Sequence, residues 1–530
     1  MLLSQTQSPR YWTDRFQLES ADVEHLVSHF LETERPLTNR ELALSVIERR
    51  LRQESDKLRR LIERGQLFQP KQDYDIGQEL IFPAFDFATG KVTARRDAVN
   101  PDDGAFQVIT VQMDDSQHSV YELASGYQAL HQLNIDLSGE GAIFQSETPE
   151  AIYAQYREPI TDSIEARLVD EADMVYFGGR WFLKSLLVPV GIGEMHLAEA
   201  ILDINNGGPV PTAQLVDEIE LAKSAPQPIR EFSLDVKMNS DERFDEVGPA
   251  GYIWWFLRRL EPVEVSKMPD RLVYSPIPYD RSLLTPELLS LEADLDDEYS
   301  DLPTVGDVNE ATLTLIYPHR RSGTLPLTSR VGAMFPTANE ALRIRVALVD
   351  GQNGNEFPGW VVRDKRYVVG LETLYRSYKL PVGAYVTVRR GDNPTQLVID
   401  FRAHKPHSEY IRLITPANNH LTFSNHKRAI AAEYDAFLIV GAEDLEGVDN
   451  VAAAMLRDKR RNLPELMRDI MIELAKISQQ DAVHAKTLYS AVNVVRRCPP
   501  GPIFSALVAR PEFTHVAGPY WRVTTAGESQ

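Results

Sequence analysis

The sequence predicts a multidomain α+β protein in which several small modules, each made of short helices followed by a β-hairpin, are combined with one or two small β-barrels. Three observations predict this class. The chain has 530 residues, more than one ordinary domain contains. Helical and strand-like hydrophobic periods alternate along it in short runs. A hairpin sequence with Phe, Val, Gly-Pro and Trp in the same order occurs twice, each time after helices.

Composition limits the class of protein. Hydrophobic residues make up 43% of the chain and charged residues 25%, the balance of a globular protein. No apolar run is long enough to span a membrane, and the first residues lack the basic and apolar regions of a signal peptide. The single cysteine, Cys498, excludes an internal disulfide framework and a multi-cysteine zinc site. We therefore expect a cytoplasmic protein with no membrane partner.

Charge is distributed unevenly. The net charge is −21, which argues against a polyanionic partner for the chain as a whole. Residues 1–310 carry 28 basic and 56 acidic side chains, whereas residues 311–530 carry 28 basic and 21 acidic ones. The two parts therefore have net charges of −28 and +7. We expect nucleic-acid contacts in the C-terminal part, and the acidic part either faces a basic partner or keeps the protein soluble.

The clearest module lies at residues 191–262. A helix after Met195 stops at Asn206-Gly207-Gly208-Pro209, Thr212 can cap a second helix, a third follows, and an aromatic hairpin ends at Leu257. Helices followed by a hairpin give the element order of a winged helix-turn-helix. We predict a helical winged-helix-like module at 1–68, a small β-barrel or meander at 69–120, a mixed α/β region and degenerate winged helix at 121–190, a winged helix at 191–262, a mobile acidic linker at 263–310, a β-barrel at 311–425 and a C-terminal winged helix at 426–530.

The hairpin repeat joins two distant segments. Phe244 and Val247 precede Gly248-Pro249, and Trp254 and Trp255 follow; Phe513 and Val516 precede Gly518-Pro519 and Trp521. Phe and Val are expected to pack the first strand onto the helices, and Trp to anchor the return strand. The sequence from Val175 through Gly178-Gly179 to Trp181 is a candidate third copy.

On these residues the segments 193–262 and about 460–525 resemble HARE-HTH modules, the winged-helix family that includes the N-terminal domain of the RNA polymerase delta subunit. The resemblance implies a role in transcription, chromatin or DNA recognition, and it identifies no catalytic residue. The aromatic insert Tyr252-Ile253-Trp254-Trp255-Phe256 departs from the family pattern. More loosely, the segment from Phe357 to Val388 is similar to the pseudobarrel DNA-binding domains of plants.

Candidate nucleic-acid contacts are basic or polar side chains near the predicted recognition helix and among the aromatic residues of the barrel. Solvation of exposed faces is the alternative explanation for the same residues. The candidates are Arg363, Lys365, Arg366, Lys379, Arg389 and Arg390 in the barrel, and Arg460, Arg461, Lys486, Arg496, Arg497, Ser505 and Arg510 in the C-terminal module.

Motifs for chemistry are missing from the sequence. It has no phosphate-binding loop, no dinucleotide fingerprint and no nucleophile elbow. His404 and His407 lack a third ligand, so we assign no metal site. We predict a non-catalytic nucleic-acid-binding, transcription-associated protein without a cofactor, which prefers DNA to RNA and has RNA polymerase or another DNA-handling protein as a candidate partner. Two alternatives stay open: an acidic scaffold whose winged helices bind proteins, and the DNA-recognition subunit of a restriction-like defence system.

Overall fold

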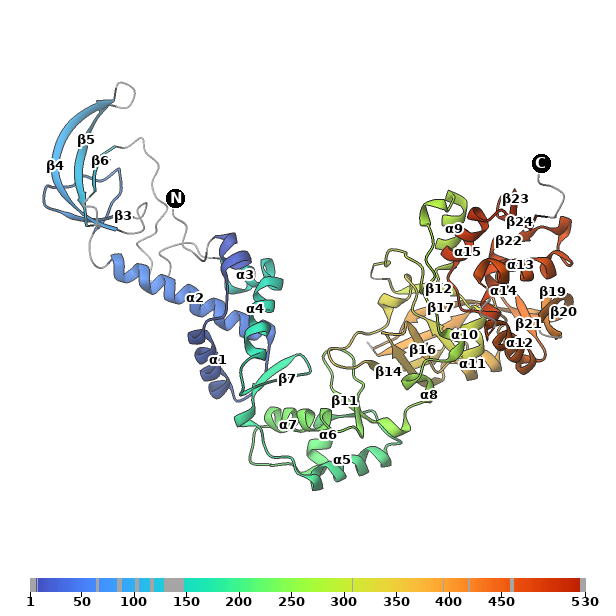
Figure 1. Cartoon of the computed structure of the whole chain (residues 1–530). Helices are drawn as coiled ribbons and strands as arrows, with labels where there is room; N and C mark the ends of the chain where they lie inside the picture. Colours follow the sequence, from blue (N-terminus) through green and yellow to red (C-terminus); the bar gives the residue numbers. More distant parts are fainter. Residues whose placement is uncertain are drawn as a thin grey trace. The chain divides into compact units, whose positions relative to one another are not determined.

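The computed structural model describes residues 6, 8–62, 66–82, 88–100, 104–114, 119–127, 147–306, 308–393, 395–417, 420–457 and 462–524. The protein is mixed α+β (Figure 1). It divides into two compact units, one comprising residues 1–189 and 222–233 and the other residues 190–221 and 234–530. Among the described residues, no helix combines the length and the apolar character that crossing a membrane requires.

The first unit contains a helical module that is interrupted in sequence. Leu37 of its first strand pairs with Trp181 of its last, and Phe30 meets the edge of the Phe182 ring. The predicted division of 1–68 from 121–190 therefore separates strands of one sheet, whose order is β1-β8-β7. The elements are α1 (Ser20–Thr33), β1 (Leu37–Thr38), α2 (Asn39–Ile62), α3 (Pro149–Gln155), α4 (Arg157–Val169), β7 (Met174–Phe177) and β8 (Arg180–Leu183).

Between α2 and α3 the chain forms a five-stranded sheet. Its strands neighbour one another in chain order, as in the predicted meander. Buried side chains of Tyr74, Phe82 and Ile109 form its core. The strands are β2 (Gln66–Leu67), β3 (Glu79–Phe82), β4 (Ala88–Asn100), β5 (Gly104–Met113) and β6 (Val120–Ser125).

A second module follows at residues 192–257. Its sheet has the order β10-β11-β9, and the indole N–H of Trp255 donates to Thr212 at the start of α6. Helix α7 begins in the first unit and ends in the second. The elements are α5 (Ile192–Ile204), β9 (Val210–Pro211), α6 (Thr212–Ile219), α7 (Gln227–Asn239), β10 (Phe244–Glu246) and β11 (Trp254–Leu257).

The C-terminal module repeats this order of helices and strands. Its sheet, β22-β24-β23, again places the first strand beside the last. The module packs around Leu488, Phe504 and other buried apolar residues. The elements are α13 (Leu463–Ala475), β22 (Val483–His484), α14 (Ala485–Val495), α15 (Pro500–Ala509), β23 (Phe513–Ala517) and β24 (Tyr520–Val523).

A tryptophan occupies the same place in all three modules. It lies on the last strand, opposite the first residue of the first strand, and it is buried in each case. The repeat found in the sequence therefore has a structural counterpart, in which Trp255 rather than Trp254 is the equivalent residue. The pairs are Trp181 with Leu37, Trp255 with Val210, and Trp521 with Val483.

The predicted barrel at 311–425 contains a seven-stranded sheet that curls into a half-barrel. Strands predicted near 312, 343, 384 and 396 are present, as is the helix predicted at 371–378. The strand order is β12-β17-β18-β14-β15-β16-β13, and β14 and β18 are parallel. The elements are β12 (Glu310–Thr314), α10 (Tyr317–Ser322), β13 (Thr324–Pro326), β14 (Arg343–Asp350), β15 (Glu356–Val362), β16 (Tyr367–Val369), α11 (Glu372–Ser377), β17 (Tyr385–Arg390) and β18 (Gln396–Phe401).

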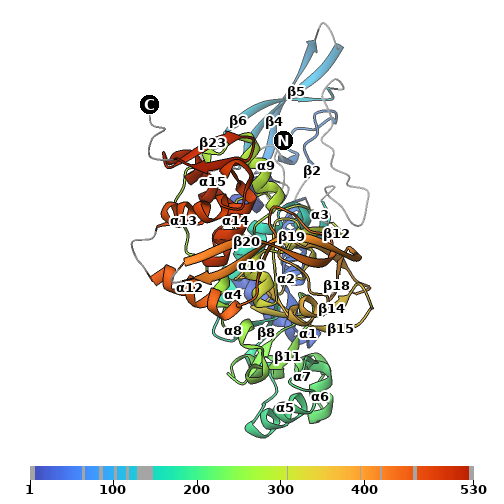
Figure 2. The same cartoon turned by 90° about the vertical axis from the view of Figure 1, so that its right-hand side faces the viewer.

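A separate sheet follows, with the order β20-β19-β21. Its two long strands, β19 (Ala403–Ala417) and β20 (His420–Ala432), pair antiparallel and form a ribbon (Figure 2). Strand β21 (Val440–Ala442) pairs only with the middle of β19, at Arg412–Ile414. Helix α12 (Leu445–Arg457) packs against both long strands.

The segment expected to be an acidic linker is folded. It contains α8 (Val263–Ser266) and α9 (Pro286–Leu295), and Thr285 caps α9. Glu292, Asp297 and Glu298 are buried. Arg281 pairs with Glu292, and Arg497 pairs with both other carboxylates. The prediction of a mobile linker at 263–310 is therefore wrong, because Arg281 within the segment and Arg497 from the C-terminal module neutralise these acids.

Short helices of other types connect these elements. They are η2 (Tyr11–Arg15), η4 (Lys184–Leu186), η5 (Arg258–Leu260), η6 (Asp270–Leu272), η7 (Arg281–Leu283), η8 (Gly332–Met334) and η9 (Gln479–Asp481).

Candidate nucleic-acid interface

An exposed, basic part of the β19–β20 ribbon is the candidate interface. Residues 405–410 of β19 and 425–429 of β20 are exposed to solvent, whereas neighbouring positions such as Ile411 and Ile430 are buried. We call residues 404–410 and 426–428 the basic ribbon. It carries one acidic side chain, Glu409, and six basic side chains, of which three are lysine or arginine and three are histidine. These groups are His404, Lys405, His407, His426, Lys427 and Arg428.

A β-bulge shapes one edge of the basic ribbon. The pairing shifts between Ala403, opposite Ala432, and His407, opposite Ile430. Pro406 lies in this shift and has no N–H for a ladder hydrogen bond. A bulge bends its strand and changes the direction of the side chains on it. The local sequence therefore explains why Lys405 lies outside the regular ladder.

Tyr410 and Lys427 are directly opposite each other on the basic ribbon. The Lys427 ammonium lies 5.2 Å from the centre of the Tyr410 ring, within cation–π range, and 67% of the Tyr410 residue is exposed. Arg428 pairs with Glu443 at the surface. Such an exposed ion pair contributes little free energy, so a phosphate can compete for this guanidinium. Because neighbouring residues of a strand point to opposite faces, Tyr410 and Lys427 lie on one face of the ribbon, and Arg428 lies on the other face, on the side of Ile411 and Ile430.

A cavity of about 380 Å³ lies beside the basic ribbon, and we call it the ribbon cavity. Ile411, Arg428 and Ile430 belong both to the ribbon strands and to the wall of this cavity. Its floor is apolar, and five cationic side chains and one carboxylate line it. Three of the cations already have a carboxylate partner, because Arg376 pairs with Glu372, Arg321 with Asp449 and Arg428 with Glu443. The cations are Arg320, Arg321, Arg376, Lys379 and Arg428, and the carboxylate is Glu372.

A larger cavity of about 760 Å³ is less suited to an anion. Arg271 and Arg321 line it, and both donate to the carboxylate of Asp449. Arg271 also donates to the carbonyl of Val494 at 2.7 Å. Arg496 lies on its wall as well. Because Asp449 already neutralises two of its guanidinium groups, this cavity offers less positive charge than its residue content suggests.

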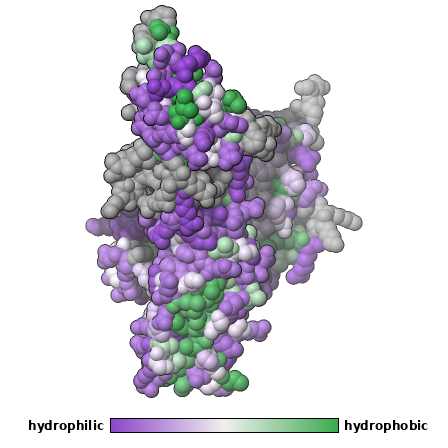
Figure 3. Space-filling model, turned by 90° about the vertical axis from the view of Figure 1, so that its left-hand side faces the viewer, coloured by the Kyte–Doolittle hydropathy of each residue, from purple (hydrophilic) through white to green (hydrophobic). Residues whose placement is uncertain are grey.

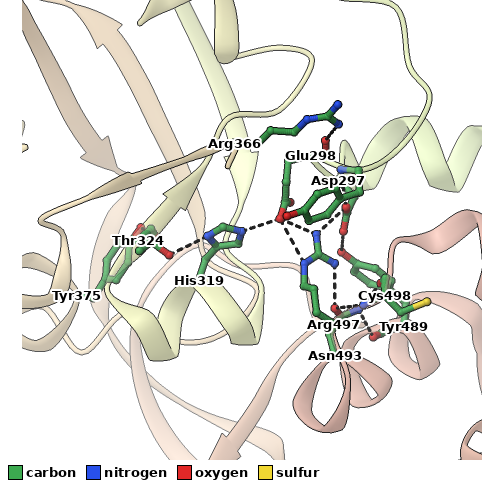
Figure 4. A network of polar contacts seen from close by, with 11 residues as sticks. Asp297, Glu298, His319, Thr324, Arg366, Tyr375, Tyr489, Asn493, Arg497 and Cys498 are labelled. Carbon is green, nitrogen blue, oxygen red and sulfur yellow. Dashed lines mark hydrogen bonds and ion pairs between the residues drawn. The ribbon is translucent and has the colours of Figure 1, made fainter. Parts of the chain in front are cut away.

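Arg497 is the centre of a buried polar network (Figure 4). Its guanidinium lies 2.6 Å from Asp297 and 2.7 Å from Glu298, and none of these three side chains is exposed by more than 2%. Tyr489 donates to Asp297, and Asn493 accepts from Arg497 at 3.0 Å. The prediction that Arg497 contacts nucleic acid is wrong, because solvent cannot reach the side chain and its guanidinium is already paired with two carboxylates.

The network extends from Glu298 into the half-barrel. His319 lies 3.0 Å from Glu298 and 2.9 Å from the hydroxyl of Thr324, whose carbonyl accepts from Tyr375. Burial opposes ionisation of Glu298, but Arg497 and His319 outweigh it and lower the pKa of this carboxyl. Burial raises the pKa of the neighbouring Cys498 thiol to about 12. Cys498 is therefore an unreactive buried thiol at neutral pH.

Two further predicted contacts are also buried. Lys486 is 8% exposed and pairs with Asp294 and Asp435. Ser505 is 4% exposed and donates to the carbonyl of Asp280 at 3.2 Å. Helix α15, which carries Ser505, has no charged residue and packs against α9 and η7. The predicted recognition surface of the C-terminal module is thus covered by the protein's own chain.

The predicted barrel residues are dispersed. Arg363 donates to the carbonyls of Gly332, Phe335 and Pro336. Lys365 and Arg366 donate to the carbonyls of Ser266 and Glu298, respectively.

Other predicted residues have separate settings. Arg389 pairs with Asp400, and Arg390 is exposed on β17. Arg510 is exposed at the end of α15, and Lys379 lies at the ribbon cavity. Arg460 and Arg461 lie outside the described residues. Of the predicted set, the structure thus brings only Lys379 among the described residues to the ribbon cavity.

The strongest candidate residues were missed in the sequence prediction. Lys427 and Arg428 lie on a strand that the predicted barrel boundary at 425 cuts. A signal for them exists, because the basic segments 404–407 and 426–428 flank an Asn-Asn pair at 418–419. Asparagine favours turns, so this pattern is typical of a hairpin with two basic strands.

Another surface feature is apolar. Figure 3 shows a hydrophobic band over the module that contains α5. On α5, Leu197 is 52% exposed and Ile204 82% exposed. These residues are seven positions apart, with Ala200 and Ile201 between them, so they form a stripe along one face of the helix. We call these four residues the α5 stripe.

No family model, curated protein or solved structure matches this chain.

His404 and His407 have ring centres 5.2 Å apart. The described residues nevertheless contain no cluster of three or more His, Cys, Asp or Glu side chains arranged to hold a metal ion. Function is therefore inferred from the geometry of the basic ribbon and the ribbon cavity.

Proposed function

We propose that this protein binds nucleic acid without catalysis, and that the basic ribbon forms the contact surface. The observation that carries the proposal is the exposed set Lys405, Lys427, Arg428 and Tyr410 on one antiparallel pair of strands. Lysine and arginine neutralise phosphates, and release of condensed counterions drives binding. An exposed tyrosine ring can stack on a base.

The shape of the surface favours DNA over RNA. A two-stranded β-ribbon fits the wide major groove of B-form DNA, whereas the major groove of A-form RNA is too deep and narrow for it. The net charge of +7 in residues 311–530 supports a nucleic-acid partner for this part of the chain, because the acidic remainder of the chain repels phosphate.

We further propose that the three modules with the shared tryptophan are winged helices. Their common order of helices and strands, and the pairing of Trp255 with Val210 and Trp521 with Val483, support this. Membership of the HARE-HTH family, a place in transcription and a cytoplasmic location stay predictions. Because α15 packs against α9, the C-terminal module has a structural role in this proposal, and the ribbon replaces it as the contact surface.

The test measures binding of the full chain to a DNA duplex by fluorescence anisotropy over a range of salt concentrations. The variant Lys405→Ala/Lys427→Ala/Arg428→Ala is expected to bind more weakly at low salt. Each phosphate contact contributes about 0.9 to the slope of log affinity against log salt. Loss of three cations should therefore reduce that slope by about 2 to 3.

A matched control removes three exposed cations from other places in the second unit. The control variant is Lys267→Ala/Lys476→Ala/Arg510→Ala, which changes the net charge equally. It should retain the wild-type slope within about one unit. Equal losses in both triple variants would show that only net charge matters, and the assignment of the ribbon would be abandoned.

A second candidate function is protein binding through the α5 stripe. The exposed apolar residues Leu197 and Ile204 favour it. Glu199 and Asp203 of the same helix pair with Arg243 and Arg259 in partly exposed ion pairs, for which a basic partner can compete. An amphipathic helix with an apolar face and basic flanks complements such a surface. The occupant we propose is therefore a basic amphipathic helix of a partner protein.

A labelled synthetic helix of leucine and lysine tests this candidate. It should bind the wild-type chain, and the variant Leu197→Ser/Ile204→Ser should lose the interaction. A peptide of the same composition but scrambled order controls for charge alone. Equal binding of both peptides would contradict the proposed contact between the α5 stripe and the apolar face of a partner helix.

A further inference from the structure

The ribbon cavity combines an apolar floor with a cationic rim. Its floor is contributed by the loop after α11, by β21 and by the ribbon strands, including Leu380, Ile411, Ile430 and Val440. Its volume of about 380 Å³ falls in the range of small-molecule sites. An apolar floor accepts the flat face of an uncharged group, while the rim favours an attached anion.

Arg320 is a partly buried cation of this rim, and no carboxylate among the described residues pairs with it. Its Nε donates to the carbonyl of Leu380 at 2.6 Å, and its guanidinium lies 5.8 Å from the centre of the Tyr375 ring. Burial, aided by Arg376 and Arg321, lowers the pKa of Arg320. A bound anion would stabilise this guanidinium, because it would offset both desolvation and the neighbouring positive charges.

Tyr317 supplies a second, independent observation. Its residue is 4% exposed and lies on the cavity wall, yet its hydroxyl has no hydrogen-bond partner among the described residues. The Nε of Arg321, on the same helix α10, is likewise buried without a partner among them. Buried polar atoms are normally paired. Both atoms are closed to solvent in this structure, so a ligand in the cavity would become their partner only through a local rearrangement of the cavity wall.

We infer that the ribbon cavity binds one unstacked nucleotide of a nucleic acid that lies on the basic ribbon. The base lies against the apolar floor, and Arg320, Arg376 and Arg428 face its phosphate. This inference rests on the proposed function, since the ribbon presents the strand. The shared residues Ile411, Arg428 and Ile430 make the cavity continuous with the ribbon, which favours a nucleotide over an isolated fatty-acid anion.

Removing a base from its stack costs free energy, and a pocket that holds the base compensates for this cost. Single-stranded or mismatched sites therefore have an advantage over intact duplex. The chain should bind a single strand or a duplex with one mismatch more tightly than a fully paired duplex of the same length.

The experiment uses the full chain and a single strand with one 2-aminopurine, compared with the same strand carrying an abasic position. Contact by a base in the cavity should make the base-containing strand bind on the order of tenfold more tightly. A nucleoside monophosphate should compete at lower concentration than inorganic phosphate. Decanoate serves as an apolar anion without a base.

Two variants locate the effect. Leu445→Trp should block the cavity, because Leu445 lines it and is 39% exposed, so the larger ring can be accommodated at the surface. Tyr317→Phe removes the unpaired hydroxyl. Both should lose the preference for the base-containing strand while keeping the salt slope of the wild type. Leu342→Trp, at a 70% exposed position away from the cavity lining, is the control.

The outcomes separate this inference from the proposed function. Equal binding of base-containing and abasic strands, with a normal salt slope, would overturn the nucleotide site and leave the ribbon intact. Absence of binding to both the single strand and the duplex at low salt would overturn both. Competition by decanoate but not by a nucleoside monophosphate would assign the cavity to an apolar anion and overturn the inference.

Discussion

Trp255 donates its indole N–H to the hydroxyl of Thr212 at 3.1 Å, which ties the last strand of the second module to the start of its second helix. The first module has the same contact, between Trp181 and Asn39 at 2.8 Å. The C-terminal module has Ala485 at the start of α14, and the buried indole nitrogen of Trp521 has no hydrogen-bond partner among the described residues.

We expect Ala485→Ser to stabilise the C-terminal module. A hydroxyl at the position of Asn39 and Thr212 would accept from Trp521, and a hydrogen bond of this kind contributes about 1 kcal/mol. Thermal unfolding of wild type and variant measures the change. The converse substitution, Thr212→Ala, should lower stability by a similar amount, although Asp235 still accepts from Trp255 at 2.9 Å. Destabilisation by Ala485→Ser would show that the site has no room for the hydroxyl.

The buried network around Arg497 predicts a large loss of stability for Arg497→Met. The substitution leaves Asp297 and Glu298 without their shared cation, and breaking a buried ion pair in this way costs about 3–5 kcal/mol. Chemical denaturation measures the loss. Arg497→Lys, which keeps the charge but not the forked geometry, should recover part of it. A loss below about 1 kcal/mol would be inconsistent with the network as the centre of this fold.

From the raised pKa of Glu246 we expect the free energy of unfolding to fall as the pH rises. Burial raises its pKa to about 8 from 4.5, although its carboxylate accepts from the amides of Gly248 and Trp254. Between these values the folded state holds a proton that the unfolded state has released. The free energy of unfolding therefore decreases by up to about 1.4 kcal/mol for each pH unit in that window. Glu246→Gln should remove this slope, as followed by denaturation at several pH values.

From the lowered pKa of His484 we expect the free energy of unfolding to fall as the pH falls. Burial, followed by the charge of Lys486, lowers the pKa of His484 to about 4 from 6.5. Its ring stacks on Phe437 with centres 3.8 Å apart. Between pH 6.5 and 4 the unfolded state takes up a proton that the folded state excludes, so stability falls as the pH falls.

The variant His484→Gln should lose this acid-side slope. Because Glu246 and His484 have opposing effects between pH 4.5 and 6.5, the comparison uses the difference between each variant and wild type. A variant that follows the wild-type curve throughout would show that His484 is protonated in the folded state as easily as in the unfolded one.

Sequence patterns predicted local elements better than long-range partners. The half-barrel strands β12, β14, β17 and β18 were predicted because strand-like apolar runs separated by turn residues identify them directly. The hairpin repeat pointed to the shared tryptophan because it repeats within a short window. The pairing of β1 with β8 was not predicted, because a local sequence pattern cannot indicate that two strands pair when a long insertion separates them.

The candidate site was harder to predict for a related reason. Charge content alone assigned Lys486 and Arg497 to nucleic acid, but each is neutralised by acids that lie about 190 to 200 positions away in sequence, such as Asp294 and Asp297. The acidic segment was assigned to a linker for the same reason. Lys427 and Arg428 carry the same charges as Arg497, and only tertiary structure separates exposed from buried cations.

The insertion in the first module affects the order in which the modules can form during synthesis. The contact between Trp181 and Asn39 spans 142 residues, whereas the equivalent contact between Trp255 and Thr212 spans 43. Closing the longer loop costs about 1 kcal/mol more in chain entropy, and its last strand leaves the ribosome only after the entire inserted sheet. The helices α1 and α2 are therefore synthesised well before the strand that carries Trp181, and their apolar face stays unfilled until that strand is available.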